Sequence, residues 1–242
     1  MHAMSKSQRP ATLRPRRTRR GTLARPLDAL IFLLPLILFY EVASLARQER
    51  VIAFEALFHF FKLFGYVGVW APGLAVVIIL IATHVASGDR WAIHWDRVGW
   101  MYVESVAFSV PLLLLNWAVP LGPDDGVGTF IQRMALGIGA GIYEELVFRL
   151  IIISLIVILA ADLLRLDRAG VAVAAVILSS LAFAAHHHRP IGVEMFDPLR
   201  FTFRAVAGVY LAVIFWLRGY GPAAGCHAAY NVALVVVTWL RS

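Results

Sequence analysis

Tyr143-Glu144-Glu145-Leu146-Val147-Phe148-Arg149 places three charged side chains inside the longest apolar run of the chain, residues 129–166. Ionisable residues inside a membrane segment are rare and usually functional. On a helix, Glu145 and Arg149 are four residues apart and share one face, so the arginine can neutralise that carboxylate. Glu144 is rotated by about 100° from its neighbour. Glu144 therefore needs a different partner.

Two later apolar segments carry further polar side chains. They contain Phe183-Ala-Ala-His186-His187 and His227-Ala-Ala-Tyr230-Asn231, and each stretch again has an i, i+4 pair that shares one helix face. Helices that carry one carboxylate, one imidazole, and one imidazole with an amide can converge on a polar pocket in a membrane. We expect the rest of the chain to hold this pocket together.

The composition is that of a polytopic membrane protein. Hydrophobic residues make up 60% of the 242 residues, and the mean hydropathy is +0.76. Soluble domains contain about 45 to 50% apolar residues. The single cysteine, Cys226, excludes an intramolecular disulfide and a cysteine-rich metal site, and we expect it to be packing material in a helix.

Basic residues near the N-terminus contribute much of the net charge of +7. Eight of the 22 Lys and Arg residues lie in the first 25 positions, directly before an apolar segment. The positive-inside rule explains such a tail by membrane topology, with the N-terminus cytoplasmic. We therefore expect residues 1–26 to be a disordered cytoplasmic tail, 27–242 to be one transmembrane domain with its motif-bearing core at 129–240, and nucleic acid not to be a partner.

The apolar segments predict about eight transmembrane helices, since each crossing needs roughly 20 apolar residues. The expected spans are 27–46, 67–86, 98–119, 129–149, 150–164, 169–187, 200–217 and 223–240, with an amphipathic interfacial helix at 50–64. The Gly137-x-Gly139-x-Gly141 spacing predicts that another helix approaches closely. No internal repeat is evident, so an inverted-repeat transporter has no support from the sequence.

If the run 129–166 is divided near Arg149, the motif residues lie at different depths in the membrane. If all eight segments cross fully, Glu144 and His187 lie toward the cytoplasmic side, whereas His227 lies about one or two turns from the opposite side. One segment must then cross incompletely, or one helix must be longer and tilted. We expect the short segment 150–164 to be the one that does not cross the membrane as a regular span.

The three motifs, in this order and spacing, resemble those of the CAAX prenyl protease and bacteriocin-processing family, called CPBP or Abi. That family has the pattern Glu-Glu-x-x-x-Arg, Phe-x-x-x-His and His-x-x-x-Asn. Here the motifs read EELVFR at 144–149, FAAHH at 183–187 and HAAYN at 227–231. The resemblance covers about 100 residues and implies an intramembrane protease.

The resemblance also implies residue roles. Glu144 would be the general base, His187 would help to activate the water, and His227 with Asn231 would form the oxyanion site. Glu145 and Arg149 would support the helix. Apart from the resemblance, we expect Phe183 to be a packing residue.

Elementary chemistry agrees with these roles. A carboxylate in an apolar setting has a raised pKa and can accept a proton from water near neutral pH. The tetrahedral intermediate needs hydrogen-bond donors, which an Asn231 amide and a His227 imidazole can provide. Nucleophilic routes are poorer, because there is no Gly-x-Ser-x-Gly, and Cys226 and His227 point about 100° apart on a helix.

Other readings of these residues stay open. Glu144, His187 and His227 would make a three-ligand zinc site with an open position, although no His-Glu-x-x-His is present, and we favour metal-free chemistry without a cofactor. Asn231 would also serve simply to bond two helices. A non-proteolytic scaffold or immunity protein of the same fold and a proton-coupled transporter are the alternatives from other functional classes.

We therefore expect an all-α bundle of transmembrane helices that encloses a polar catalytic cavity. Its expected function is glutamate-type intramembrane proteolysis in a bacterial inner membrane. The substrate would be a membrane-tethered or lipid-anchored protein or peptide, processed at a CAAX end, a leader or a C-terminal sorting tail.

Overall fold

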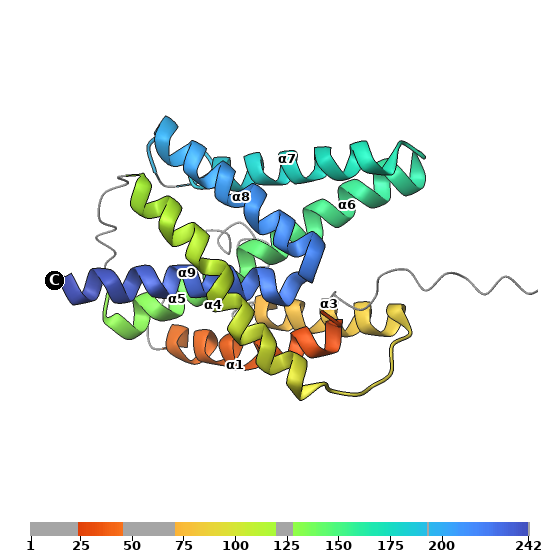
Figure 1. Cartoon of the computed structure of the whole chain (residues 1–242), viewed down its shortest axis with the longest axis horizontal. Coiled ribbons are helices and arrows are strands. Elements are labelled where there is room, and N and C mark those ends of the chain that lie inside the picture. Colours follow the sequence, from red (N-terminus) through yellow and green to blue (C-terminus); the bar gives the residue numbers. More distant parts are fainter. Residues whose placement is uncertain (1–23, 46–70, 120–127, 193, 242) are drawn as a thin grey trace, which may run out of the picture.

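The computed structural model describes residues 24–45, 71–119, 128–192 and 194–241, and its named elements are all helices. The predicted all-α fold is therefore confirmed. Nearly all of the predicted tail, the interfacial helix 50–64 and the start of the second span lie outside the described residues. The helices are α1 (Pro26–Leu45), α3 (Ala71–Ser87), α4 (Trp95–Ala118), α5 (Phe130–Glu145), α6 (Ser154–Ile156), α7 (Arg168–His186), α8 (Pro198–Arg218) and α9 (Tyr220–Arg241) (Figure 1).

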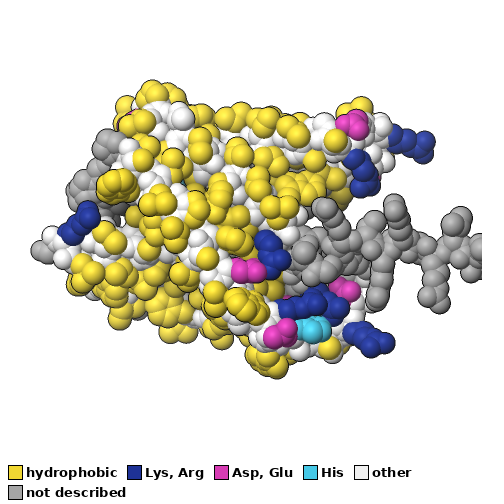
Figure 2. Space-filling view, in the orientation of Figure 1, with side chains coloured by type: hydrophobic (Ala, Val, Ile, Leu, Met, Phe, Trp, Pro, Cys, Tyr) yellow, Lys and Arg dark blue, Asp and Glu magenta, His cyan; other side chains and the backbone are white. Residues whose placement is uncertain are grey.

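Six helical stretches of the described residues are long and apolar enough to cross a membrane. They are Pro26–Ala43, Trp95–Ala118, Phe130–Leu163, Arg168–His186, Pro198–Arg218 and Tyr220–Arg241, and α3 is a shorter apolar helix. Large apolar side chains such as Trp117 and Leu114 are exposed. In the view of Figure 2, apolar side chains cover most of the surface, and most of the charged ones gather toward one end. This is the surface of an integral membrane protein.

The run 129–166 is one continuous helical stretch and not the two spans that the sequence predicted. The chain continues without a turn from Phe130 to Leu163, through a π-helical segment at Leu146–Ile153 and a second at Val157–Leu163. Thirty-four residues rise about 50 Å, more than the roughly 30 Å of a hydrocarbon core, so this helix must tilt or bend. The predicted reversal near Arg149 is absent. One crossing between Glu144 and His227 therefore disappears, and with it the predicted conflict of depth.

The helix starts follow familiar capping chemistry. Thr129 and Gln132 form a reciprocal capping box at the start of α5, with hydrogen bonds of 3.4 and 2.8 Å. At the start of α8, the Asp197 carboxylate accepts from the N–H groups of Leu199 and Arg200. These caps satisfy backbone donors that would otherwise lack partners at a helix start.

Antiparallel packing of α5 against α9 forms the centre of the bundle. Gly137 faces Asn231, and Gly141 faces Ala228 so closely that a Cβ at residue 141 would collide with the Ala228 backbone. Gly139 meets the ring of Tyr40 on α1 in the same way. The close helix approach predicted from the three glycines is therefore present.

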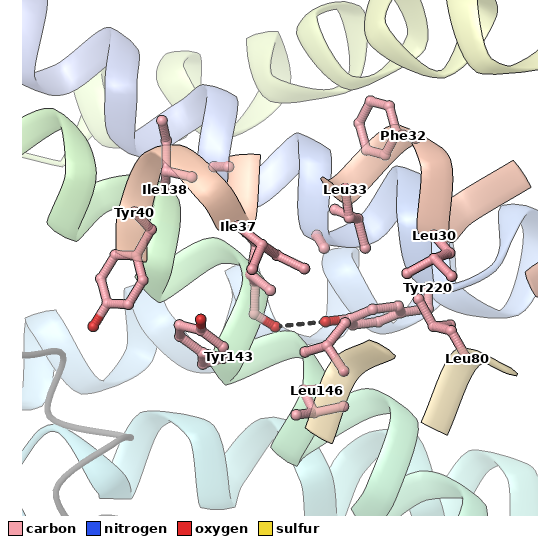
Figure 3. Close-up of a cluster of buried hydrophobic side chains, with 14 of the residues drawn as sticks. Leu30, Phe32, Leu33, Ile37, Tyr40, Leu80, Ile138, Tyr143, Leu146 and Tyr220 are labelled. Atoms are coloured by element: carbon pink, nitrogen blue, oxygen red, sulfur yellow. Dashed lines mark hydrogen bonds between the residues drawn. The ribbon is translucent and has the colours of Figure 1, made fainter. Parts of the chain in front are cut away.

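The main hydrophobic core lies between α1, α3, α5 and α9 (Figure 3). The Tyr220 hydroxyl donates a 2.9 Å hydrogen bond to the carbonyl oxygen of Ile142 inside this core. Cys226 is a buried free thiol in a second apolar cluster, in line with its predicted packing role. This packing fixes the last turn of α5, which carries the two glutamates.

Candidate active site

Glu144 and Glu145 are the last two residues of α5, directly before the π-helical segment, and both side chains are buried. Short π-helical insertions occur frequently at functional sites because they change which side chains share a helix face. Two adjacent buried carboxylates repel each other and need separate partners. The structure supplies these partners from α7, α9 and Arg149.

Glu145 bonds to two cationic or potentially cationic side chains through one oxygen. Its Oε1 lies 3.1 Å from Arg149 Nη1 and 2.9 Å from His227 Nδ1. The Arg149 partner is the one that the i, i+4 spacing predicted. The His227 partner comes from α9 and was not expected from the sequence.

Arg149 is completely buried and is held from three directions. Besides the contact with Glu145, its Nη2 donates a 3.2 Å hydrogen bond to the carbonyl oxygen of Gly208 on α8. Its guanidinium carbon lies 4.5 Å from the centre of the Phe183 ring on α7. Arg149 therefore joins α7 and α8 to the helix that carries the glutamates.

Glu144 lies between two imidazoles from different helices. Its Oε1 is 3.9 Å from His187 Nε2, and its Oε2 is 3.8 Å from His227 Nε2. These separations exceed direct hydrogen-bond length, and a polar contact of this length is often bridged by water. His187 and His227 therefore both face Glu144, the glutamate that has no i, i+4 cation.

Hydrogen bonds at the other ring nitrogens assign the imidazole protons. His187 Nδ1 lies 2.9 Å from the Phe183 carbonyl oxygen, which only accepts, so Nδ1 carries the proton and Nε2 presents a lone pair to Glu144. His227 Nδ1 donates in the same way to Glu145. Burial, together with the positive charge of Arg204, lowers the pKa of His187 to about 3. His187 is therefore neutral at ordinary pH.

The other two histidines of the triplet have different surroundings. The His186 ring packs against Phe148 with ring centres 5.5 Å apart. His188 Nδ1 donates to the Met195 carbonyl oxygen at 3.2 Å. The imidazole contacts with Glu144 come from His187 and His227.

Asn231 lies one helical turn after His227 on α9, and its amide Nδ2 donates a 3.0 Å hydrogen bond to the Gly137 carbonyl oxygen. Gly137 is seven residues before Glu144, about 10 Å along α5. The amide nitrogen has a second N–H, which this bond does not use. Asn231 therefore bonds two helices and still has a donor to offer.

The chain is similar in sequence to a known protein family. Residues 126–233 match the family model described as Type II CAAX prenyl endopeptidase Rce1-like. Over these residues, which are somewhat less than half of the chain, the protein is similar to the Rce1-like family. The match spans all three motifs and confirms the resemblance to CPBP proteases. Comparisons with curated proteins and with solved structures find no match.

Two hydrogen bonds near the site were not predicted from the sequence. The Tyr143 hydroxyl donates a 2.9 Å bond to Glu41 Oε1, and Ser179 Oγ donates to the Phe148 carbonyl oxygen at 2.5 Å. Both bonds join the glutamate-bearing helix to a neighbour. The position of Glu41 inside an apolar segment was a usable signal, because a buried carboxylate needs a donor.

Glu144, His187 and His227, the three side chains considered as zinc ligands, do lie close together. However, no group of three or more His, Cys, Asp or Glu side chains within the described ranges is arranged to hold a metal ion.

Proposed function

We propose that the protein is an intramembrane endopeptidase that hydrolyses a peptide bond near the C-terminus of a membrane-tethered, CAAX-type protein. The family match supports the protease class and the CAAX type of substrate. The placement of Glu144 between two imidazole Nε2 atoms is the observation that carries the mechanism.

The nucleophile is a water molecule held by Glu144 and His187. One water hydrogen is donated to the Glu144 carboxylate and the other to the lone pair at His187 Nε2. As the water oxygen attacks the substrate carbonyl carbon, Glu144 accepts the first proton. The bond from His187 Nδ1 to the Phe183 carbonyl keeps Nε2 in the accepting form throughout.

The charge that develops on the substrate oxygen is stabilised from α9. His227, held at Nδ1 by Glu145, donates from Nε2 to this oxygen when both ring nitrogens carry hydrogen. The free N–H of Asn231 is the second donor. When the C–N bond breaks, the proton on Glu144 passes to the leaving amine, which restores the carboxylate.

The orientation follows the positive-inside rule. The basic residues before α1 favour a cytoplasmic N-terminus, and we infer a bacterial inner membrane as the location. The substrate is then a protein anchored in the same bilayer. A lipid anchor positions the scissile bond close to the membrane surface.

The test uses the full-length protein in liposomes with three peptides, which are a prenylated CAAX peptide, its unprenylated form and a bacteriocin-type leader peptide. Mass spectrometry of the products should show loss of C-terminal residues from the prenylated peptide. Cleavage of the leader peptide alone would replace the CAAX assignment by leader processing. No cleavage of any of the three would contradict the protease assignment.

A further inference from the structure

Arg204 and Glu194 form a bidentate ion pair beside the candidate active site. Arg204 Nη1 and Nη2 lie 2.8 and 2.6 Å from the two carboxylate oxygens of Glu194. The arginine belongs to α8, and the glutamate precedes that helix. Neither residue belongs to the three sequence motifs.

Backbone contacts place this pair next to His187. The Glu194 N–H donates a 3.2 Å hydrogen bond to the His187 carbonyl oxygen, and the Glu194 carbonyl accepts from the Arg189 N–H at 2.8 Å. The charge of Arg204 also contributes to the lowered pKa of His187. Arg204 therefore lies near the imidazole that faces Glu144.

Arg204 also shares a face of α8 with the site. It lies one turn before Gly208, whose carbonyl oxygen accepts from Arg149. Because residues four apart on a helix lie on one face, this face points toward the glutamate-bearing helix. Arg204 stands about 6 Å along α8 from the Gly208 contact.

The ion pair of Glu194 and Arg204 is partly exposed. The side chain of Glu194 is 32% exposed and that of Arg204 is 18% exposed, so the glutamate reaches water more readily than the arginine does. A substrate carboxylate in the place of Glu194 would restore the same two parallel hydrogen bonds, because a guanidinium fork fits any carboxylate in this way.

We propose that Arg204 is a specificity-determining residue that binds the free C-terminal carboxylate of the substrate in place of Glu194. The inference rests on the proposed function. A CAAX sequence has three residues after its cysteine, and three extended residues span at most about 11 Å. A terminal carboxylate is thus within a short distance of a scissile bond held at Glu144.

The experiment compares one membrane-tethered peptide as the free C-terminal acid and as the C-terminal amide. The wild type should cleave the acid with a kcat/KM about tenfold or more above that of the amide, because the amide loses charge-assisted hydrogen bonds. Arg204→Gln should lower kcat/KM for the acid to the level of the amide and leave the amide unchanged. Arg200→Gln, on the same helix, is the matched control and should retain the preference for the acid.

Glu194→Gln distinguishes exchange from a purely structural pair. If the carboxylates compete, this variant should have an unchanged or lower KM for the acid, opposite to the effect of Arg204→Gln. Equal losses on acid and amide in both variants would overturn the inference, as would wild-type cleavage of both peptides at one rate. Absence of wild-type cleavage of either peptide would instead contradict the proposed function.

Discussion

His227 Nδ1 lies 2.9 Å from Glu145 Oε1, so the second glutamate of the motif holds the imidazole that faces the first. The same oxygen lies 3.1 Å from Arg149 Nη1. Glu145 thereby links α9 to Arg149 and indirectly to α7 and α8. The two adjacent glutamates have separate tasks, since Glu144 faces the two Nε2 atoms and Glu145 orients one of the rings.

This division of tasks predicts different stabilities for two variants. Glu145→Ala leaves the buried Arg149 without its carboxylate, and breaking one side of a buried pair typically costs about 3 to 5 kcal/mol. Glu144→Gln keeps the shape of the side chain and breaks no such pair. The Tm in detergent should therefore fall further for Glu145→Ala. The reverse order would mean that the roles of the two glutamates are exchanged.

Substitution of Asn231 tests whether its amide stabilises the oxyanion or only bonds two helices. Asn231→Ala should lower kcat about 100- to 1,000-fold, because one oxyanion donor is lost. Its hydrogen bond to the Gly137 carbonyl oxygen also predicts a modest fall in Tm. Asn116 on α4 is the matched control, because its amide oxygen accepts a 3.1 Å hydrogen bond from Tyr230 on α9. Asn116→Ala should keep kcat, and a similar kcat for both variants would make Asn231 a helix-bonding residue.

Most of the helices and the contact of Glu145 with Arg149 could be predicted from the sequence, for physical reasons. The apolar segments from 98 onward match α4, α7, α8 and α9 to within a few residues, because a span needs a fixed apolar length. The i, i+4 rule likewise anticipated the contact of Glu145 with Arg149. Both predictions depend on short-range geometry.

The predictions that were wrong or missing depend on longer-range geometry. Hydropathy cannot divide the run 129–166, which has neither a proline nor a polar turn, and the structure continues it as one helix with π-helical segments. Helix periodicity indicates which residues share a face, but not which helix that face meets. The bonds from His227 to Glu145 and from Asn231 to Gly137 were therefore beyond prediction.

The ion pair of Glu194 and Arg204 predicts a pH dependence of stability. Partial burial acts to raise the pKa of Glu194, but the hydrogen bonds and positive charge of Arg204 outweigh it and hold the pKa below its usual value. The pair thus stabilises the fold above about pH 4.5, and this contribution is lost as the pH falls through the lower folded-state pKa. Between about pH 6 and 3.5, the Tm of the wild type should fall more than that of Glu194→Gln. Equal falls would contradict the pair's contribution.

Metal analysis tests the choice between protein groups and zinc. A zinc protease contains about one metal per chain and loses activity to chelators. We expect purified active protein to contain substoichiometric zinc and to keep its activity after dialysis against a chelator. Stoichiometric zinc, with activity lost on chelation and restored by zinc, would assign Glu144, His187 and His227 as ligands.

The most direct test of the account is the cleavage rate of Glu144→Gln in liposomes with a prenylated CAAX peptide. Glu104, a carboxylate in α4 paired with Arg218 at 2.5 Å, provides the matched control. Glu144→Gln should show no cleavage above background while its Tm stays close to that of the wild type, and Glu104→Gln should retain most of the activity. Cleavage by Glu144→Gln at near the wild-type rate would contradict the central claim that this carboxylate activates the water.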